Sequence, residues 1–255
     1  MSENTDGEPT ELSDAAQMRW DALKDTVVDV AGATGDANGF AAAFAAMRQV
    51  GRGVDLQEAL NALHVPQDAG DHEEALRRML VRIPDGWGRW ISCSRGWYPI
   101  VVELDQQMAT LFPTYELHQV KEKYGGLRYY WHASERVLDP SDPEPVWPAL
   151  GDDATKDEKD TALAAWSEAY DAWLLRLERY LQTEEGASRE AELERRAKLA
   201  EELVDAAELR ASVTCEMCGR PGRMHRTQAQ HAWYQTLCPA CATERGYVRA
   251  GDSDQ

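Results

Sequence analysis

The sequence predicts an α+β fold, and three patterns along the chain support this prediction. Apolar residues recur at helical spacing in two long regions, residues 13–84 and residues 155–210. Between them, residues 87–135 contain strand-forming side chains around a Gly-Gly pair. Residues 213–250 hold four cysteines in two close pairs. We therefore expect N-terminal helices, a central helix with a β-hairpin layer, a projecting helical hairpin and a C-terminal cysteine-rich finger.

The composition is that of a soluble folded protein. Of 255 residues, 43% are hydrophobic and 28% are charged, which excludes a disordered chain, a collagen-like repeat and a disulfide-packed miniprotein. Residues 1–12 are acidic and polar, so they predict a flexible tail and not a secretion signal. Because no apolar run is long enough to span a bilayer, the sequence predicts a cytoplasmic protein without a membrane partner.

The net charge of −18 is unevenly distributed. Residues 1–210 carry 22 basic and 41 acidic side chains, whereas residues 211–255 carry 5 basic and 4 acidic ones. Such an acidic surface disfavours nucleic acid and favours an unidentified protein partner. Two interpretations of the acidic excess stay open, a solvated surface and a mimic of DNA.

Cap residues predict where the helices of residues 13–84 begin. A helix follows Ser13 and continues to about residue 31. Asp55 and Glu58 have the spacing of a capping box, in which each side chain binds a free N–H group of the other. Two further helices are expected after Asp36 and after Asp71.

The segment 87–135 predicts a short strand, a helix and then a β-hairpin. Strand-forming residues flank Gly125-Gly126, and we place this pair at the centre of a two-residue turn because glycine readily adopts positive φ. Counting outward from that turn puts Lys123 opposite Arg128.

One face of this hairpin is predicted to be apolar and the other cationic, because side chains alternate along a strand. Two hypotheses for the cationic face stay open. Carboxylates such as Glu116 or Glu103 neutralise it, or it binds an anion or an acidic partner. The candidate binding residues on this face are Lys121, Lys123, Arg128, Tyr130 and His132.

The region after the hairpin divides into a loop and a pair of helices. Residues 136–154 are acidic and rich in proline, which predicts a long surface loop. Thr155 and Glu158 fit a capping box at the start of residues 155–210. Apolar residues recur there every three or four positions on both sides of Gly186, so we expect a helical hairpin that packs on itself or on the body, or a coiled coil between molecules.

The four paired cysteines predict a structural zinc site. Cys215, Cys218, Cys238 and Cys241 form the pattern C-x2-C-x19-C-x2-C, which suits a four-thiolate zinc ion. Four thiolates complete the tetrahedron and leave no position for water, so such sites are structural. Paired disulfides are the less favoured alternative in a reducing compartment, and the spacing gives an iron–sulfur centre no special support.

The finger resembles the treble-clef fingers of GATA-type domains and of the zinc module of Clp-type unfoldases. The similar residues are Cys215 to Gly219, Trp233-Tyr234 and Leu237 to Cys241. This resemblance implies a DNA partner or a protein partner without choosing between them. The residues that would contact phosphate are Arg220, Arg223 and Arg226, but the chain ends in acidic residues and not in the basic extension of GATA-type fingers.

A second resemblance is to uncharacterised bacteriophage and prophage proteins. It rests on Gly96-Trp97-Tyr98, on the hairpin from Val120 to Tyr130 and on the C-terminal cysteine pairs. The resemblance covers less than a third of the chain and implies that hairpin and finger form one module.

We interpret the protein as non-enzymatic. The sequence has no nucleophile elbow, phosphate loop, dinucleotide fingerprint or zinc-protease motif. The remaining cysteine, Cys93, is interpreted as a core residue, and the alternative is a nucleophile assisted by His118 or His132. The sequence thus favours a zinc-stabilised protein-interaction protein, encoded by a phage or prophage and acting on a host or phage protein. The alternative is a binder of anions or nucleic acid through the cationic hairpin face and the finger loop.

Overall fold

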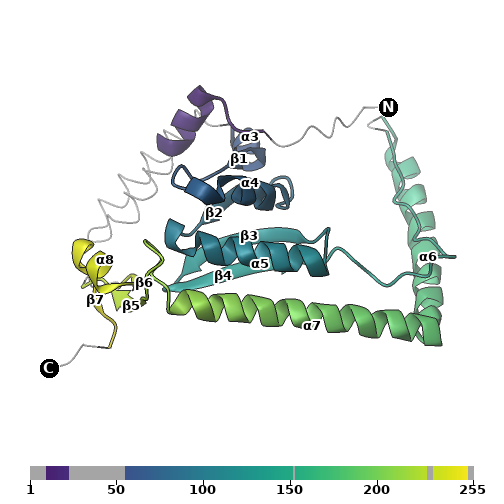
Figure 1. Ribbon diagram of the computed structural model, residues 1–255. Coiled ribbons are helices and arrows are strands. Elements are labelled where there is room, and N and C mark those ends of the chain that lie inside the picture. The colour runs from purple at the N-terminus through teal and green to yellow at the C-terminus, as the bar shows by residue number, and fades with distance from the viewer. Residues whose placement is uncertain (1–9, 23–54, 152, 229–231, 252–255) are drawn as a thin grey trace. The chain divides into compact units, whose positions relative to one another are not determined.

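The computed structural model describes residues 10–22, 55–151, 153–228 and 232–251. The chain divides into two compact units, one of residues 1–132 with 203–255 and one of residues 133–202. Helices and two β-sheets are both present, which confirms the α+β fold class (Figure 1). Three predicted features lie outside the described residues: most of the tail, the second half of the first helix and the helix after Asp36.

Two helices of the N-terminal region begin at their predicted caps, whereas the helix expected after Asp71 has His72 as its N-cap, without a side-chain hydrogen bond. Residues 14–22 are helical, and the Ser13 hydroxyl accepts the Ala16 N–H group at 3.4 Å. Asp55 accepts the N–H groups of Gln57 and Glu58 and starts helix α3. The bounds of these elements are α3 Leu56–Asn61, the short 3-10 turn η1 Gly70–His72 and α4 Glu73–Val81.

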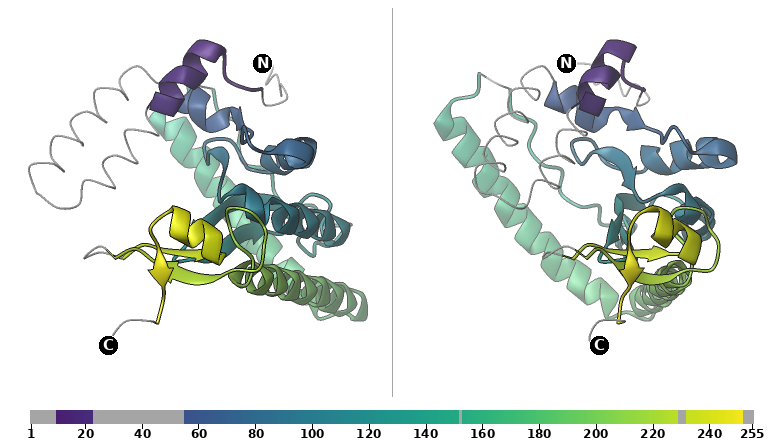
Figure 2. Two further views of the ribbon diagram at one scale, coloured as in Figure 1. Left: turned by 60° about the vertical axis from the view of Figure 1, so that its left-hand side comes forward. Right: turned by 90° about the vertical axis from the view of Figure 1, so that its left-hand side faces the viewer.

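A four-stranded sheet forms the centre of the first unit. Its strand order is β1-β2-β3-β4, with β1, β2 and β3 parallel and β4 antiparallel to β3. Helices α4 and α5 lie together on one side of it (Figure 2). The bounds are β1 Leu63–His64, β2 Arg89–Ser92, the 3-10 turn η2 Arg95–Trp97, α5 Tyr98–Leu111, β3 Glu116–Lys123 and β4 Gly126–His132.

The core lies between these helices and the sheet. Fully buried side chains from both layers meet there: Leu76, Met79, Leu80, Leu104, Met108, Leu117, Val120 and Leu127. The core also holds a polar group, because the Tyr115 hydroxyl donates to Asp105 at 2.5 Å and lies 2.6 Å from the Tyr129 hydroxyl. Arg82 pairs with Asp105 at 3.1 Å, so the buried carboxylate has both a charged and a neutral partner.

The hairpin turn lies one residue earlier than predicted. Tyr124 and Gly125 are its central residues, with φ of 54° and 79°, and Lys123 pairs with Gly126. The predicted Gly125-Gly126 turn is therefore wrong, and Gly126 is the first residue of β4. Two side chains hold Gly125 in place: the Glu122 carboxylate accepts its N–H group, and the Thr236 hydroxyl donates to its carbonyl at 2.7 Å.

The shifted turn also corrects the predicted pairing of cations. Lys121, and not Lys123, lies opposite Arg128. An irregularity between Leu117 and Gln119 interrupts the register, so that both Leu117 and Val120 are buried on the apolar face. Burial of these two side chains on the same face explains why the strand tolerates the bulge.

The cysteine-rich finger is a small sheet followed by a short helix. The strand order is β6-β5-β7, and both pairings are antiparallel. The bounds are β5 Arg223–Arg226, β6 Tyr234–Leu237, α8 Pro239–Glu244 and β7 Val248–Arg249.

The second unit contains α6 Lys156–Leu181 and the first part of α7 Glu184–Ser212. The capping box of Thr155 and Glu158 is present as predicted. The two helices diverge after residues 182–183 and do not lie side by side, which differs from the predicted helical hairpin (Figures 1 and 2). Gly186 lies within α7, where an added Cβ would come 2.2 Å from the Tyr180 carbonyl, so it permits a tight corner instead of separating two arms.

The apolar seam of α6 is covered by the acidic loop. Trp166 donates to the Pro145 carbonyl at 3.2 Å, and Trp173 donates to the Asp142 carbonyl at 3.0 Å. Arg176 pairs with the Asp142 carboxylate at 2.7 Å. The loop therefore takes the place that the prediction gave to the second helix.

The turn geometry predicts different effects for its two glycines. Gly125→Ala should lower the free energy of unfolding by about 1–2 kcal/mol, because an L-residue at positive φ is strained, and its Cβ would lie 3.3 Å from the Met224 side chain. Gly126→Ala should cost less, since the atom nearest its Cβ is the movable end of Arg128 at 3.2 Å and the Lys123 carbonyl lies at an ordinary contact distance of 3.6 Å. Urea unfolding of both variants measures the difference, and equal losses would contradict the turn assignment.

Candidate metal centre

Each cysteine pair is presented by a different local structure. Cys215 and Cys218 lie in a tight loop that Gly219 closes with φ of 73°. Cys238 is the N-cap of α8, and Cys241 lies in its first turn. Because α8 begins at Pro239, a residue favoured at the first helical position, the local sequence places both sulfur atoms at the start of the helix.

The four sulfur atoms lie together in a geometry that fits a metal ion. All four are within 4.8 Å of one another. The Cys218 sulfur is 3.6 Å from the sulfur atoms of Cys238 and Cys241, close to the separation of about 3.8 Å that tetrahedral Zn–S bonds of 2.3 Å require. All five cysteines are free thiols, so no disulfide competes for these atoms. The predicted ligand set can hold a metal ion and is consistent with zinc.

Arg220 supports this cluster electrostatically. Its guanidinium donates to the Cys218 sulfur at 3.3 Å, and this contact lowers the pKa of Cys218 to about 6. A thiolate is the form that binds metal. The sequence assigned Arg220 to phosphate contact, but the structure places it against the cluster, while Arg223 is exposed on β5 and Arg226 is half-buried on the same strand.

Glu216, which lies between the first two cysteines, attaches the finger to residues 94–96, just before α5. Its side chain is 2% exposed, and its carboxylate accepts from the Ser94 N–H group at 3.1 Å and from Gln235 at 3.3 Å. Its backbone carbonyl accepts from the Gly96 N–H group at 2.7 Å. Sequence reasoning missed this residue, because the position between two ligands carries no signal for burial.

Gly96 is required by the same contact. A Cβ added there would lie 2.2 Å from the Cys215 carbonyl and 2.5 Å from the Glu216 carbonyl. Next to it, the Trp97 indole donates to the Thr214 carbonyl at 2.8 Å. The turn at residues 95–97 and the loop that holds the first cysteine pair are therefore packed backbone against backbone.

Burial also perturbs the acids at this interface. It raises the pKa of Glu216 to about 7, and the nearby Glu122 carboxylate raises it further while the Ser94 hydrogen bonds oppose the shift. Burial likewise raises the pKa of Glu122. Docking the finger therefore brings two carboxylates into a partly dehydrated environment, which the surrounding N–H donors compensate.

No family model, curated protein or solved structure matches this chain. Within the described ranges, no helix has the length and apolar character needed to cross a membrane.

The predicted cationic face lies on the side of the sheet opposite α5. Its basic side chains contact residues other than those expected from the sequence. Arg128 pairs with Glu208 of α7 at 2.9 Å, and not with either of the carboxylates named as candidates. Lys121 lies over the Tyr130 ring at 5.3 Å and Lys123 over the Tyr124 ring at 5.5 Å. Glu103 instead pairs with Arg210 and Glu116 lies 3.6 Å from His118.

Cys93 does not have the environment of a reactive nucleophile. Burial raises the pKa of its thiol, and the carboxylates of Glu216 and Asp68 raise it further. A protonated thiol is a poor nucleophile. The two histidines proposed as its partners stack on each other at 6.0 Å instead.

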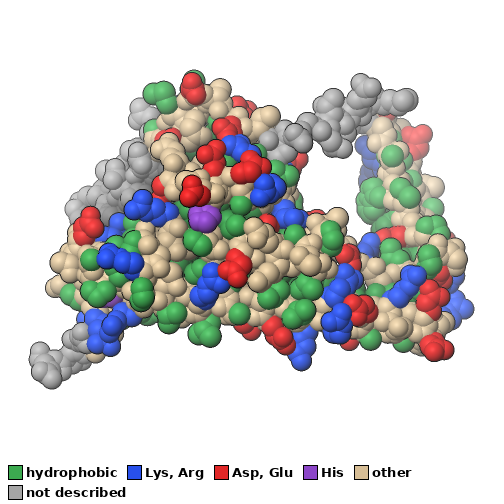
Figure 3. Space-filling view, in the orientation of Figure 1, with side chains coloured by type: hydrophobic (Ala, Val, Ile, Leu, Met, Phe, Trp, Pro, Cys, Tyr) green, Lys and Arg blue, Asp and Glu red, His purple; other side chains and the backbone are tan. Residues whose placement is uncertain are grey.

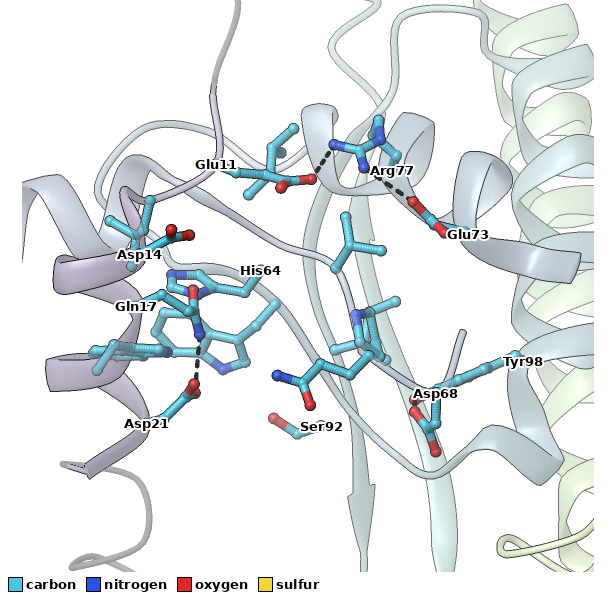
Figure 4. Close-up of a pocket in the computed structure, with 18 residues that line it drawn as sticks. Glu11, Asp14, Gln17, Asp21, His64, Asp68, Glu73, Arg77, Ser92 and Tyr98 are labelled. Atoms are coloured by element: carbon cyan, nitrogen blue, oxygen red, sulfur yellow. Dashed lines mark hydrogen bonds and ion pairs between the residues drawn. The ribbon is translucent and has the colours of Figure 1, made fainter. Parts of the chain in front are cut away.

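One cavity of the first unit has an acidic lining (Figure 4). It has a volume of about 1260 Å³ and is lined by the helix over residues 14–22, by β1 and by α4. Its one lysine or arginine side chain, Arg77, pairs with Glu11 at 2.5 Å and Glu73 at 3.3 Å. Asp68 and Asp21 accept hydrogen bonds from Tyr98 and Gln17. This lining disfavours phosphate ligands.

The cluster of four cysteines predicts that the protein binds metal in a fixed ratio to the chain. We expect one zinc ion per chain, and expect Cys218→Ser or Cys241→Ser to lose it and to unfold the finger, since the thiolates are part of its small core. Cys93→Ser, which changes the cysteine outside the cluster, is the control and should keep the metal. Elemental analysis with limited proteolysis tests this, and metal-free wild-type protein purified without chelator would contradict it.

The close contact between Gly96 and the Cys215–Glu216 backbone leads to a second prediction, which concerns the packing of the finger against the turn at residues 95–97. Gly96→Ala should lower the free energy of unfolding by about 1–3 kcal/mol, as overpacking of a tight contact does. The variant should still bind metal, because residue 96 contributes no ligand. Gly126→Ala is the matched control. Denaturant unfolding and elemental analysis test this, and unchanged stability would show that the finger does not depend on this contact.

Proposed function

We propose that this protein is a non-enzymatic, zinc-stabilised protein-interaction protein. Four thiolates fill the coordination sphere of zinc and leave no position for a substrate or a reactive water. The proposed ion would therefore stabilise structure and not react. Its role is to fix the finger against the turn at residues 95–97 and against the hairpin.

The observation that carries this proposal is the conformation of Tyr124. Its side chain is 73% exposed, and its φ of 54° is unfavourable for an aromatic residue. Asparagine suits this position of a two-residue turn better. A strained residue with an exposed aromatic ring at a turn supports a role in binding, since strain of this kind clusters at functional sites.

The surroundings of Tyr124 favour a protein partner. Next to the turn, the Met224 side chain is 43% exposed and would contact a Cβ on Gly125 at 3.3 Å. We call Tyr124 and Met224 the tip surface. Aromatic residues and methionine are enriched in the centres of protein interfaces. The finger holds this surface in place, because Thr236 binds the carbonyl of Gly125.

The likeness of hairpin and finger to phage and prophage proteins supports a host or phage protein as the partner. The alternative function is the binding of anions or nucleic acid through the cationic hairpin face and the finger loop. At the finger loop this alternative has less support. The Arg220 guanidinium already donates to a cysteine sulfur. On the surface over α4 and α5, basic and acidic side chains are intermixed, so this surface has no large patch of positive charge (Figure 3).

Substitution of Tyr124 separates binding from stability. Tyr124→Asn should leave the melting temperature unchanged or raise it, because asparagine tolerates positive φ, and should abolish partner binding. A photo-crosslinking residue at position 124 identifies the partner, and the purified pair is then measured by calorimetry. Leu209→Gln, which changes a residue 71% exposed on α7, is the control. Equal affinity of wild type and Tyr124→Asn would refute the tip surface.

A further inference from the structure

The face of the central sheet opposite α5 carries exposed aromatic rings. Trp131 of β4 packs against Phe112 at 5.5 Å on the helix-covered side. Since side chains alternate along a strand, Tyr130 and His132 project from the opposite face. Both are exposed, Tyr130 by 42%. We call Tyr130 and His132, with Trp87 and His118, the aromatic stripe.

Three rings of this stripe form a column. Trp87 stacks on His118 with 4.5 Å between ring centroids and 27° between planes. His118 continues onto His132 at 6.0 Å and 19°. Trp87 is 57% exposed. A near-parallel column that ends in an exposed indole presents a flat apolar surface, which a further planar ring could extend.

Two lysines accompany the stripe. Lys121 and Lys123 lie on the same face of β3, and neither forms an ion pair with any residue that the structure describes. Arg128, which lies opposite Lys121 on β4, is already paired with Glu208. The face thus combines exposed rings with two cations whose charge is not matched by a carboxylate in contact.

We propose that the aromatic stripe binds a single-stranded nucleic acid. Its bases would stack on the rings, and its phosphates would lie near Lys121 and Lys123. Every base has a stackable face, so this recognition tolerates any sequence. A duplex conceals its base faces and would not bind this way. An acidic protein segment would use the lysines and leave the rings unused.

The net charge of −18 determines how such binding must behave. Two unpaired lysines give little electrostatic attraction, and the acidic cavity near β1 repels phosphate from that end of the sheet. Stacking must therefore provide most of the affinity, and the dependence on salt must be shallow. The rings of this site are separate from the tip surface, although Lys123 lies over the Tyr124 ring at 5.5 Å. The proposal does not depend on the proposed protein partner.

Fluorescence anisotropy of the full-length zinc-loaded chain with labelled oligothymidylate tests the proposal. We expect binding that unlabelled oligothymidylate displaces and that the matching duplex, inorganic polyphosphate and polyglutamate do not. Absence of binding would overturn the proposal. Equal displacement by polyglutamate or polyphosphate would also overturn it, by showing a surface for acidic segments or for anions in general.

Matched variants locate the site. Trp87→Ala and Tyr130→Ala should each weaken binding about 5-fold to 150-fold, the loss expected for one stacked base. Trp87→Phe keeps a ring and should retain most of the affinity, which separates stacking from misfolding. Trp233→Ala removes another indole that is 57% exposed and should change nothing. Equal effects of the substitutions at Trp87 and Trp233 would overturn the assignment.

The lysines are tested by the salt dependence. Lys121→Gln with Lys123→Gln should reduce the slope of log affinity against log salt by about 1.4, or about 0.7 per lost phosphate contact on a single strand. Lys156→Gln with Lys198→Gln removes the same charge from exposed sites on α6 and α7 and should leave the slope unchanged. An unchanged slope in the first variant would exclude phosphate contacts at Lys121 and Lys123.

Discussion

The arrangement of the first unit depends on the contact between the Cys215–Glu216 backbone and the turn at Gly96. It joins segments more than 100 residues apart, and closing so long a loop costs conformational entropy. The compensation comes from several hydrogen bonds concentrated at one place, which involve Ser94, Gly96 and Trp97. Because a glycine permits the approach, the two backbones satisfy each other's polar groups directly.

The same contact determines the conformation of the hairpin turn. With the finger docked, Thr236 reaches the carbonyl of Gly125, while Glu122 accepts the N–H group of that residue. Both backbone groups of Gly125 are thus bound by side chains. A turn held at its centre in this way can keep Tyr124 at positive φ, although the residue itself disfavours it. The four cysteines therefore influence the tip of a strand pair distant in sequence.

Structural features that depend on neighbouring residues were predictable from the sequence, whereas features that depend on contacts between distant residues were not. Caps at Ser13, Asp55 and Thr155 bind N–H groups within three residues, so sequence alone reveals them. The cysteine cluster was predictable because ligand spacing is also local. The turn was misplaced by one residue because Gly-Gly is the better local signal, whereas the contact that selects Tyr124-Gly125 comes from Thr236.

Two other differences between the expected and the observed contacts have the same origin. An apolar seam on α6 shows that something must cover it, but periodicity does not identify the cover, which is the loop around Asp142 and Pro145. From the sequence, the arginines between the two cysteine pairs could contact phosphate. In the structure, the Arg220 guanidinium instead donates to the sulfur of Cys218. In both cases the sequence shows which kind of interaction a side chain can form. The tertiary structure determines which group forms that interaction with it.

The hairpin face changes in character along its length. Near the turn it is cationic, because Lys121 and Lys123 project from β3 and Lys121 lies opposite Arg128 of β4. Toward the other end it is aromatic, because Tyr130 and His132 project from β4 and His118 of β3 stacks on His132. The acidic cavity lies near β1, toward the other edge of the sheet. An elongated ligand that places its charged groups near the turn and its planar groups on the rings would therefore run along the hairpin. A polynucleotide strand has charged and planar groups along its whole length, so it can contact both parts of this face.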